Sequence, residues 1–88
     1  MKITFSNYFE KQVDNITNSL IKKSITTAVK KIINAESLKE IPHIKKMKGS
    51  KNAYRIRIKD YRIGFFVEDD VILIVTVLHR KDIYKKFP

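Results

Sequence analysis

The chain has 88 residues, of which 43% are hydrophobic, no cysteine, and a formal net charge of +10 at pH 7. This length predicts one domain over residues 1–88, and the missing cysteines exclude disulfides and thiolate metal sites. The longest apolar run, residues 71–77 with one threonine inside it, is far short of the roughly 20 residues that a membrane span needs. The N-terminal stretch MKITFSNYFEK has no apolar segment of signal-peptide length. We expect a cytoplasmic protein without membrane contact.

The positive charge is concentrated in the C-terminal half. Residues 1–44 carry seven Lys and four acids, a balance of +3, whereas residues 45–88 carry twelve Lys or Arg and five acids, a balance of +7. All four arginines lie in the second half. Small basic domains attract polyanions, and nucleic acid is the commonest of these. The charge therefore favours a nucleic acid or ribonucleoprotein partner over simple solubility.

The N-terminal half predicts a short strand followed by a helical hairpin. Residues 2–5 alternate polar and apolar, as a strand does. Asn7 is placed to cap a helix, with Glu10 three residues later as in a capping box. Two apolar stripes at helical spacing follow, with a break expected near residues 22–24. They comprise Phe9, Val13, Ile16 and Leu20, then Ile25, Ala28, Val29, Ile32 and Ile33.

The connector after the second stripe is expected to be irregular. Pro42 ends any helix there, and Leu38, Ile41 and Ile44 are spaced apolar residues. The basic segment KKMKGSKN, residues 45–52, predicts a loop. Its lysines are either solvated or in contact with phosphate.

The C-terminal half predicts three antiparallel strands in a meander. Residues 54–58 alternate strictly, and residues 59–60 form a two-residue turn, although without the glycine that such turns prefer. Residues 61–67 form the second strand, and residues 69–70 turn the chain again. Residues 71–78 are β-branched and apolar on both sides of the strand, as in a central strand that is covered on both faces. The predicted class is α+β, with the N-terminal strand added to this sheet.

Pairing the first two strands through their turn gathers arginines on one face. If Ile58 faces Tyr61, then Arg57 faces Arg62 and Arg55 faces Gly64. Because side chains alternate across a strand, one face carries Arg55, Arg57, Arg62 and Gly64, and the other carries Tyr54, Ile56, Ile58, Tyr61, Ile63 and Phe65.

The second hairpin brings the C-terminal residues to the same end of the sheet. If Glu68 faces Val71, then Arg62 faces Val77, and His79 and Arg80 emerge just beyond. Tyr84 follows Arg80 by one helical turn.

The fold has no structural need for arginines that face each other across the two strands. Like charges directly opposite each other cost about 0.2–1 kcal/mol, and a glycine inside a strand weakens it unless something must approach closely. A solvated face would be expected to mix Lys with Glu, whereas this one holds three arginines and no acid beside them. The pattern therefore favours an anion site over a solvated face.

At these residues the chain resembles the RelE/ParE superfamily of bacterial toxins, and most closely its RelE-like branch. The matching segments are KMKGSKNAYRIRIKDYRIGFF, residues 46–66, and HRKDIY, residues 79–84. The helical hairpin and first strand also fit, so the resemblance covers nearly the whole chain. It implies a microbial-ribonuclease-like fold, an endoribonuclease that cuts mRNA in the ribosomal A site, and a cognate antitoxin that wraps the toxin.

The resemblance also implies roles for individual residues. Carried over by position, Arg55, Arg57, Arg62 and Arg80 match the family's basic residues, and Tyr84 matches its C-terminal aromatic. They would support attack of the 2′-OH on its own 3′ phosphate. Arg55, Arg57 and Arg62 would stabilise the phosphorane, since guanidinium groups match phosphate oxygens. Arg80 would stabilise the leaving group, and Tyr84 would stack on a base, orient the 2′-OH or exchange a proton.

The proton acceptor is the missing part. Some relatives have Lys where this chain has Arg55 or Arg57, and arginine, with a pKa of roughly 12 or more, is no base. Glu68 lies at the far end of its strand. His79 is then the best acid–base candidate, with the alternative that it has no role, and His43 is expected to be a surface residue.

Phosphate contacts are expected from Lys46, Lys48, Lys51 and Lys81. No cluster of His, Asp or Glu has metal-ligand spacing, and no phosphate-binding glycine loop is present, so neither metal nor cofactor is expected. Two other readings stay open. One is a ParE-like toxin that binds and inhibits DNA gyrase and cuts nothing, because a fold does not fix a function. The other is a basic RNA-binding module without chemistry.

Overall fold

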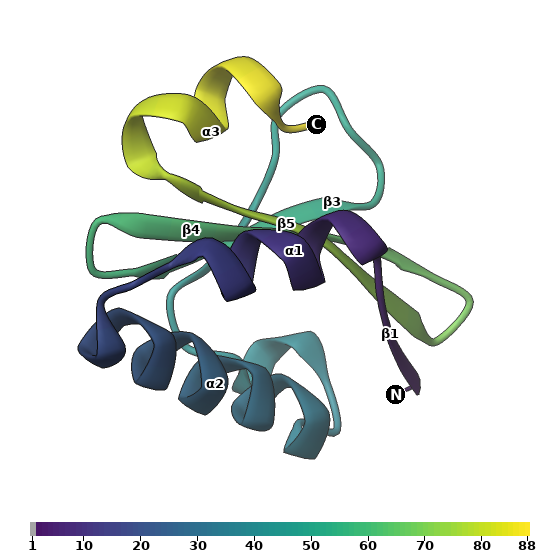
Figure 1. The fold of residues 1–88 in the computed structure, drawn as a ribbon. Helices are drawn as coiled ribbons and strands as arrows, with labels where there is room; N and C mark the ends of the chain where they lie inside the picture. The colour runs from purple at the N-terminus through teal and green to yellow at the C-terminus, as the bar shows by residue number, and fades with distance from the viewer. Residues whose placement is uncertain (1) are drawn as a thin grey trace.

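The computed structural model describes residues 2–88 as a five-stranded sheet with helices on both faces (Figure 1). The strand order is β1-β5-β4-β3-β2, with β1 parallel to β5 and the other neighbours antiparallel. The predicted α+β class, the helical hairpin and the β3–β4–β5 meander are confirmed. The elements are β1 (Lys2–Phe5), α1 (Asn7–Asn15), α2 (Ser19–Asn34), the 3-10 turn η1 (Leu38–Glu40), β2 (Ile44–Lys46), β3 (Ala53–Ile58), β4 (Tyr61–Glu68), β5 (Val71–His79) and α3 (Arg80–Lys86).

The helical hairpin begins and breaks at other residues than the sequence predicts. Ser6, not Asn7, is the N-cap of α1: its hydroxyl oxygen accepts a hydrogen bond from Phe9 N at 3.0 Å and donates to the Val75 carbonyl at 2.8 Å. The break falls at residues 16–18 rather than 22–24, because Asn18 caps α2 by accepting from the first-turn amides. The apolar periodicity located the helices, and the caps located their ends.

The basic segment after η1 was predicted to be a loop, but part of it forms a strand. Residues Ile44–Lys46 form β2, which pairs antiparallel with β3 at the edge of the sheet. Lysine is common on edge strands because its charge opposes pairing with another chain. The lysine-rich composition therefore concealed a strand.

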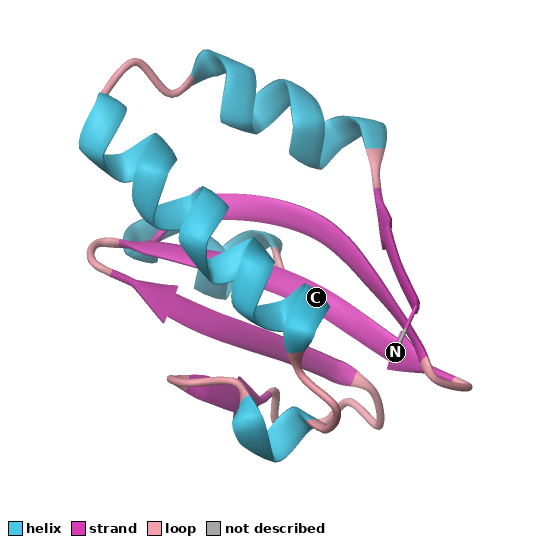
Figure 2. Ribbon diagram, turned by 90° about the horizontal axis from the view of Figure 1, so that it is seen from below, coloured by secondary structure: helices cyan, strands magenta, loops and turns pink. Residues whose placement is uncertain are grey.

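One face of the sheet packs against α1 and α2, which run across the strands (Figure 2). This α1–α2 face has the apolar residues that the alternation predicted on β3 and β4. Its buried core comprises Phe9, Ile25, Ile32, Ala35, Ile41, Ile56, Ile58, Ile63, Phe65, Ile72, Ile74 and Val77. The hydrophobic effect stabilises the domain mainly here.

Among the described residues, α3 is the helix that packs on the opposite face, which is called the α3 face below. A second, smaller cluster holds α3 there: Ala53, Ile83 and Phe87 are buried, and Met47, Phe66, Val75 and Leu78 pack around them. The prediction that β5 is covered on both faces holds at Val75 and Leu78, which pack against the α3 cluster, but not at Leu73, which is 38% exposed. The α3 face is therefore open enough to present polar side chains.

The register of β4 against β5 corrects a second prediction. Glu68 does pair with Val71, but a bulge at Gly64/Phe65 shifts the ladder, so Arg62 faces Leu78 and not Val77. A bulge places two residues of one strand against one of its partner. The shift brings His79 into the strand, opposite Tyr61. Within residues 2–88, no helix is both long and apolar enough to cross a membrane.

Candidate active site on the α3 face

The β3–β4 hairpin has the register that the sequence predicted. Arg57 pairs with Arg62, and Arg55 pairs with Gly64. The turn of residues 59–60 lacks glycine and places Lys59 at a φ of 53°. The arginines therefore lie together on the α3 face, at the end of the sheet near this turn.

The two facing arginines turn away from each other. Arg62 Nη1 donates to the carbonyl oxygens of Lys59 and Tyr61, both at 2.9 Å. Arg57 points to the β2 side, where its Nη2 lies 3.4 Å from His43 Nδ1. Each guanidinium group thus has a neighbour that reduces the cost of like charges at paired positions.

The electrostatics of Arg62 report how closely the predicted residues gather. Burial, and next the charge of Arg55, lower the pKa of Arg62 from its ordinary value. Arg57 and Arg80 act in the same direction, and Tyr84 opposes them. Arg62 stays protonated, since arginine does not lose its proton in proteins. All five residues that the sequence assigned to one anion site therefore interact electrostatically.

Tyr84 lies over Arg55. The Arg55 guanidinium carbon is 4.7 Å from the centroid of the Tyr84 ring, a cation–π contact. Hydrogen bonding to Arg55, and next the charge of Arg55, lower the pKa of the Tyr84 phenol, and Arg62 and Lys45 add smaller effects in the same direction. The side chain is 70% exposed, so its hydroxyl is open to a bound polymer.

The aromatic anchor of α3 explains the glycine inside β4. Phe87, 6% exposed, follows α3 and covers Gly64. A Cβ at Gly64 would lie 2.8 Å from Phe87 Cγ, which real Cβ atoms essentially never do. The close approach that the glycine indicated is therefore that of the protein's own phenylalanine. Phe87 and Ile83 hold α3 in place, and α3 in turn places Tyr84 over Arg55.

Arg80 begins α3 beside the β3–β4 turn. Its backbone N–H donates to the Asp60 carbonyl at 2.8 Å, and its Nε lies 3.9 Å from Asp60 Oδ1. Both side chains are more than half exposed, and ion pairs of this kind contribute only about 0–1 kcal/mol. Arg80 can therefore exchange this carboxylate for a ligand at little cost.

A depression of about 320 Å³, called the arginine hollow here, lies on the β2 side of this cluster. Arg55, Arg57 and Arg62 line it together with His43, Ile44 and Lys45. Lys45 pairs with Arg55 across β2 and β3, so its side chain shares the arginine face. The sequence prediction omitted Lys45, and only the alternation of an unrecognised strand could have identified it.

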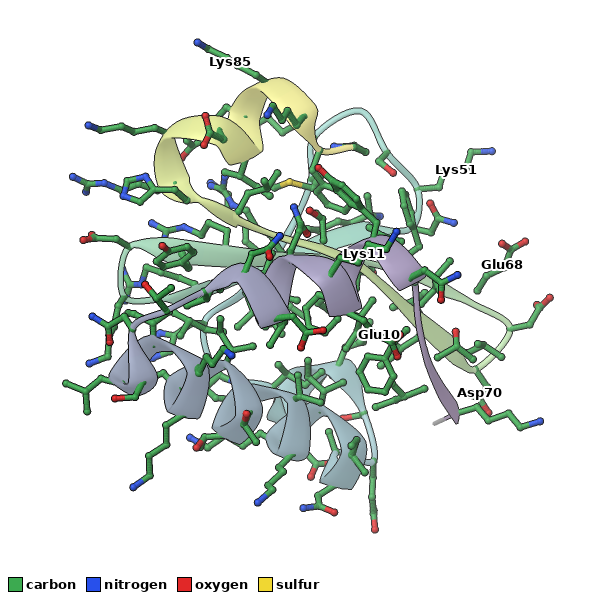
Figure 3. The ribbon with its side chains drawn as sticks, in the orientation of Figure 1. Glu10, Lys11, Lys51, Glu68, Asp70 and Lys85 are labelled. Atoms are coloured by element: carbon green, nitrogen blue, oxygen red, sulfur yellow. The ribbon has the colours of Figure 1, made fainter. Side chains whose placement is uncertain are left out.

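The four lysines that the sequence predicted to contact phosphate do not line the hollow. Lys46 pairs with Tyr54, whose ring packs toward the α1–α2 core. Lys48 and Lys51 are exposed in the turn before β3, and Figure 3 shows Lys51 projecting from that turn. Lys81 is exposed on the first turn of α3. Only Lys81 is on an element that contributes directly to the arginine cluster.

His79 is not brought to the arginines. It faces Tyr61 in the β4–β5 ladder, and the two rings meet edge to face with centroids 5.6 Å apart. Its Nδ1 accepts a hydrogen bond from Lys81 N at 3.2 Å, which makes His79 the N-cap of α3. Tyr61 packs toward the α1–α2 core, so this ring lies on the other side of the sheet.

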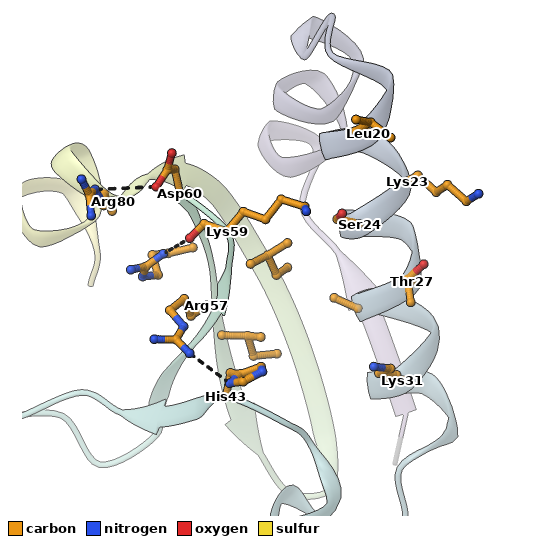
Figure 4. A pocket seen from close by; sticks show the side chains of 14 residues that line it. Leu20, Lys23, Ser24, Thr27, Lys31, His43, Arg57, Lys59, Asp60 and Arg80 are labelled. Atoms are coloured by element: carbon orange, nitrogen blue, oxygen red, sulfur yellow. Dashed lines mark hydrogen bonds and ion pairs between the residues drawn. The ribbon is translucent and has the colours of Figure 1, made fainter.

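A larger groove of about 820 Å³ runs between α2 and the ends of β3 and β4 (Figure 4). Leu20, Ser24 and Thr27 line it from α2, and Arg57, Arg62 and Arg80 are among the residues on the sheet side. The groove and the arginine hollow share Arg57, Arg62 and His43. The groove therefore gives a polymer with negative charge access to the arginine face.

Within residues 2–88, no acidic side chain lines the arginine hollow, although Asp60 lines the larger groove. Figure 3 shows Glu68 and Asp70 at the end of the molecule where β4 turns into β5. No carboxylate lines the arginine hollow, and within residues 2–88 no three His, Asp or Glu side chains form a group that could hold a metal ion. Among the described residues, the charged side chains that line the hollow are therefore all cationic, beside one imidazole and Ile44.

Comparison with known proteins gives this arrangement a family. The family described as ParE toxin of type II toxin-antitoxin system, parDE, matches residues 3–84. The chain belongs to the RelE/ParE superfamily of toxins. The predicted resemblance is confirmed over nearly the whole chain.

The RelE-like character of this toxin is supported by its relatives. It is 42% identical to Toxin RelE3 of Methanocaldococcus jannaschii over an alignment of 89 positions that covers 100% of both chains. Its fold matches the RelB-RelE antitoxin-toxin complex of Methanococcus jannaschii with a TM-score of 0.79 and 40% identity, over 96% of this chain and 98% of that one. The YoeB dimer of Staphylococcus aureus matches with a TM-score of 0.69 and 25% identity, over 86% and 92%.

Proposed function

We propose that this toxin is an endoribonuclease that cleaves mRNA on the ribosome, and that its active site is the arginine face with Tyr84. The observation that supports this most is the convergence of Arg55, Arg57, Arg62 and Tyr84 beside one open hollow. A phosphodiester in that hollow would meet three guanidinium groups, each able to bind phosphate oxygens through paired N–H donors.

The proposed reaction is attack of the 2′-oxygen on the adjacent phosphorus. The O2′–P bond forms, the P–O5′ bond breaks, and the products carry a 2′,3′-cyclic phosphate and a 5′-hydroxyl. Arg55, Arg57 and Arg62 stabilise the charge that develops on the phosphorane, a contribution that is usually the largest in such sites. Arg80, once released from Asp60, binds the phosphate on the leaving side.

Tyr84 is the proposed general acid. The lowered pKa of its phenol makes proton donation to the departing O5′ easier than from an ordinary tyrosine. Its exposed ring also offers a surface on which a base can stack. We assign His79 to the capping of α3 and Lys81 to contact with the RNA backbone.

A cognate antitoxin is the proposed protein partner. The similar toxin of Methanococcus jannaschii was solved as an antitoxin–toxin complex, and a chain with a net charge of +10 suits an acidic partner. The open α3 face and the groove beside α2 are basic surfaces that such a partner could cover.

Inhibition of DNA gyrase is the second candidate, favoured by the match to the ParE toxin family. The test is expression of the chain in cells with transcripts and plasmid topology measured together. We expect growth arrest with transcripts cut to 5′-hydroxyl ends and unchanged supercoiling. Arrest with intact transcripts and altered supercoiling would replace the nuclease by gyrase inhibition.

A further inference from the structure

Among residues 2–88, no carboxylate lines the arginine hollow to take a proton from the 2′-hydroxyl, and we propose that His43 does so. The inference rests on the proposed ribonuclease function and names its general base. The sequence indicated only a surface residue at this position. The structure places it opposite the central arginine of the site.

The backbone fixes His43 beside Arg57. Arg57 N donates to the His43 carbonyl at 3.3 Å, one step beyond the Ile44–Ile56 pair of the β2–β3 ladder. The His43 side chain lines the arginine hollow together with Lys45 and Arg57.

The conformation of His43 is uncommon for a residue other than glycine. It follows Pro42 in a turn and has a φ of +60°. A proline followed by a residue with positive φ is the arrangement of a type II turn, in which Gly or Asn is preferred. The other non-glycine residues with positive φ among residues 2–88 lie in the two hairpin turns. Histidine, like Asn and Asp, is among the non-glycine residues that adopt this conformation most often, and the turn directs the His43 side chain to the arginine hollow.

The side-chain contact suits one tautomer of the imidazole ring. His43 Nδ1 lies 3.4 Å from Arg57 Nη2. Arginine has donors and no acceptor, so in this hydrogen bond Nδ1 carries the lone pair and the ring proton is on Nε2. The distance is at the long end for a hydrogen bond, which lets a substrate hydroxyl take the place of Arg57.

Tyr84 and His43 each contact a different arginine of β3. Arg55 and Arg57 are two residues apart on β3, about 7 Å between their Cα atoms. Tyr84 lies over Arg55 and His43 lies against Arg57. A phosphate held between the two arginines would have a proton acceptor at one end and a proton donor at the other.

The proton balance of the step is then complete. The 2′-hydroxyl proton passes to His43 Nδ1 as the O2′–P bond forms. Tyr84 donates its proton to O5′ as the P–O5′ bond breaks. The imidazolium of His43 and the phenolate of Tyr84 return to their starting forms by exchange with water, so no co-reactant is consumed.

Other groups are less well placed for this role. His79 caps α3 from the other side of the sheet. Asp60 lines the larger groove but not the arginine hollow. The charged groups that line these two pockets with His43 are Lys23 and Lys31 of α2, Lys45 of β2, Arg55 and Arg57 of β3, Lys59 and Asp60 of the turn, Arg62 of β4 and Arg80 of α3.

The variant His43→Asn isolates proton transfer. Asparagine tolerates positive φ and can accept the hydrogen bond of Arg57, but it cannot take up a proton. His43→Gly keeps the turn and opens space for free imidazole. Both are compared with the wild-type toxin on ribosomes programmed with a short mRNA, by single-turnover cleavage rates from about pH 5 to 8, the range in which histidine titrates.

We expect His43→Asn to fold as stably as the parent and to lose about 10²–10⁴-fold in rate, together with the rise of the rate with pH. Imidazole should restore part of the rate of His43→Gly. The proposal is overturned if His43→Asn keeps the parent's rate and pH profile, or if the rate falls with the pH profile unchanged and no rescue by imidazole. A wild-type chain that cleaves nothing overturns the proposed function as well, and so separates the two failures.

Discussion

The two faces of the sheet differ in how they are filled. Among the described residues, twelve buried side chains join α1 and α2 to one face, whereas three hold α3 to the other. The first face has the apolar volume that keeps a small domain folded. The second has guanidinium groups, a tyrosine and an imidazole around an open hollow. Stability and reactivity are therefore assigned to opposite sides of the same strands, and substitutions should separate them.

The largest expected effect is on stability, from the α1–α2 face. Ile32 of α2 is fully buried, and Ile32→Ala should lower the free energy of unfolding by about 2–5 kcal/mol. The midpoint of urea unfolding measures this. The rate of RNA cleavage per folded molecule should stay near that of the parent, because Ile32 lines neither hollow. A specific loss of cleavage in fully folded protein would break the separation of the two faces.

The matching change on the α3 face is Arg57→Ala. Arg57 is exposed, so the free energy of unfolding should change by no more than about 0.5 kcal/mol. The cleavage rate should fall about 10²–10³-fold, the usual cost of one lost transition-state donor. Arg57→Lys is the control, since it keeps the charge without the paired donors, and it should restore only part of the rate. Unchanged cleavage by Arg57→Ala would remove this face from the reaction.

A smaller effect is expected where the second cluster supports the site. Phe87→Ala should free α3 without unfolding the α1–α2 core, because the loss is limited to what docking of α3 contributes. The pKa of Tyr84 is held down by Arg55, so detaching α3 should raise it toward the ordinary value of about 10. Titration of labelled tyrosine by NMR measures this, with Tyr84→Phe identifying the signal. An unchanged Tyr84 pKa would mean that Phe87 does not position the helix.

The finest test concerns Gly64. A Cβ there would lie 2.8–2.9 Å from three ring carbons of Phe87, so Gly64→Ala should displace the ring and lower the cleavage rate less than Phe87→Ala does. Adding Phe87→Leu to Gly64→Ala should relieve the clash and recover part of the rate. Non-additive rates in this double-mutant cycle are the expected result. Purely additive rates would place the effect of Gly64 in the strand itself.

The features that the sequence predicted correctly are those set by neighbouring residues in the chain. The β3–β4 register followed from two short turns and alternation, so the pairing of Arg57 with Arg62 was predicted correctly. The apolar stripes located both helices. These features depend on local periodicity, which is legible in one chain.

The missed features depend on contacts between distant segments. Ser6 was not identified as a cap because its second partner is the carbonyl of Val75. The bulge opposite Gly64 and the seat of Phe87 on that glycine need the assembled sheet. His43 and Lys45 reach the site only because β2 forms at the edge next to β3, and a lysine-rich segment gave no sign of a strand.

We propose that the α3 face cleaves RNA through the substrate's own 2′-hydroxyl. Ribosomes programmed with an mRNA in which the nucleotide 5′ to the cut carries 2′-deoxyribose test this. We expect the unmodified mRNA to be cut to a 2′,3′-cyclic phosphate and a 5′-hydroxyl, and the single deoxy substitution to block the cut at that position. Cleavage of the deoxy-substituted mRNA at the same bond would show that water is the nucleophile and would exclude the proposed mechanism.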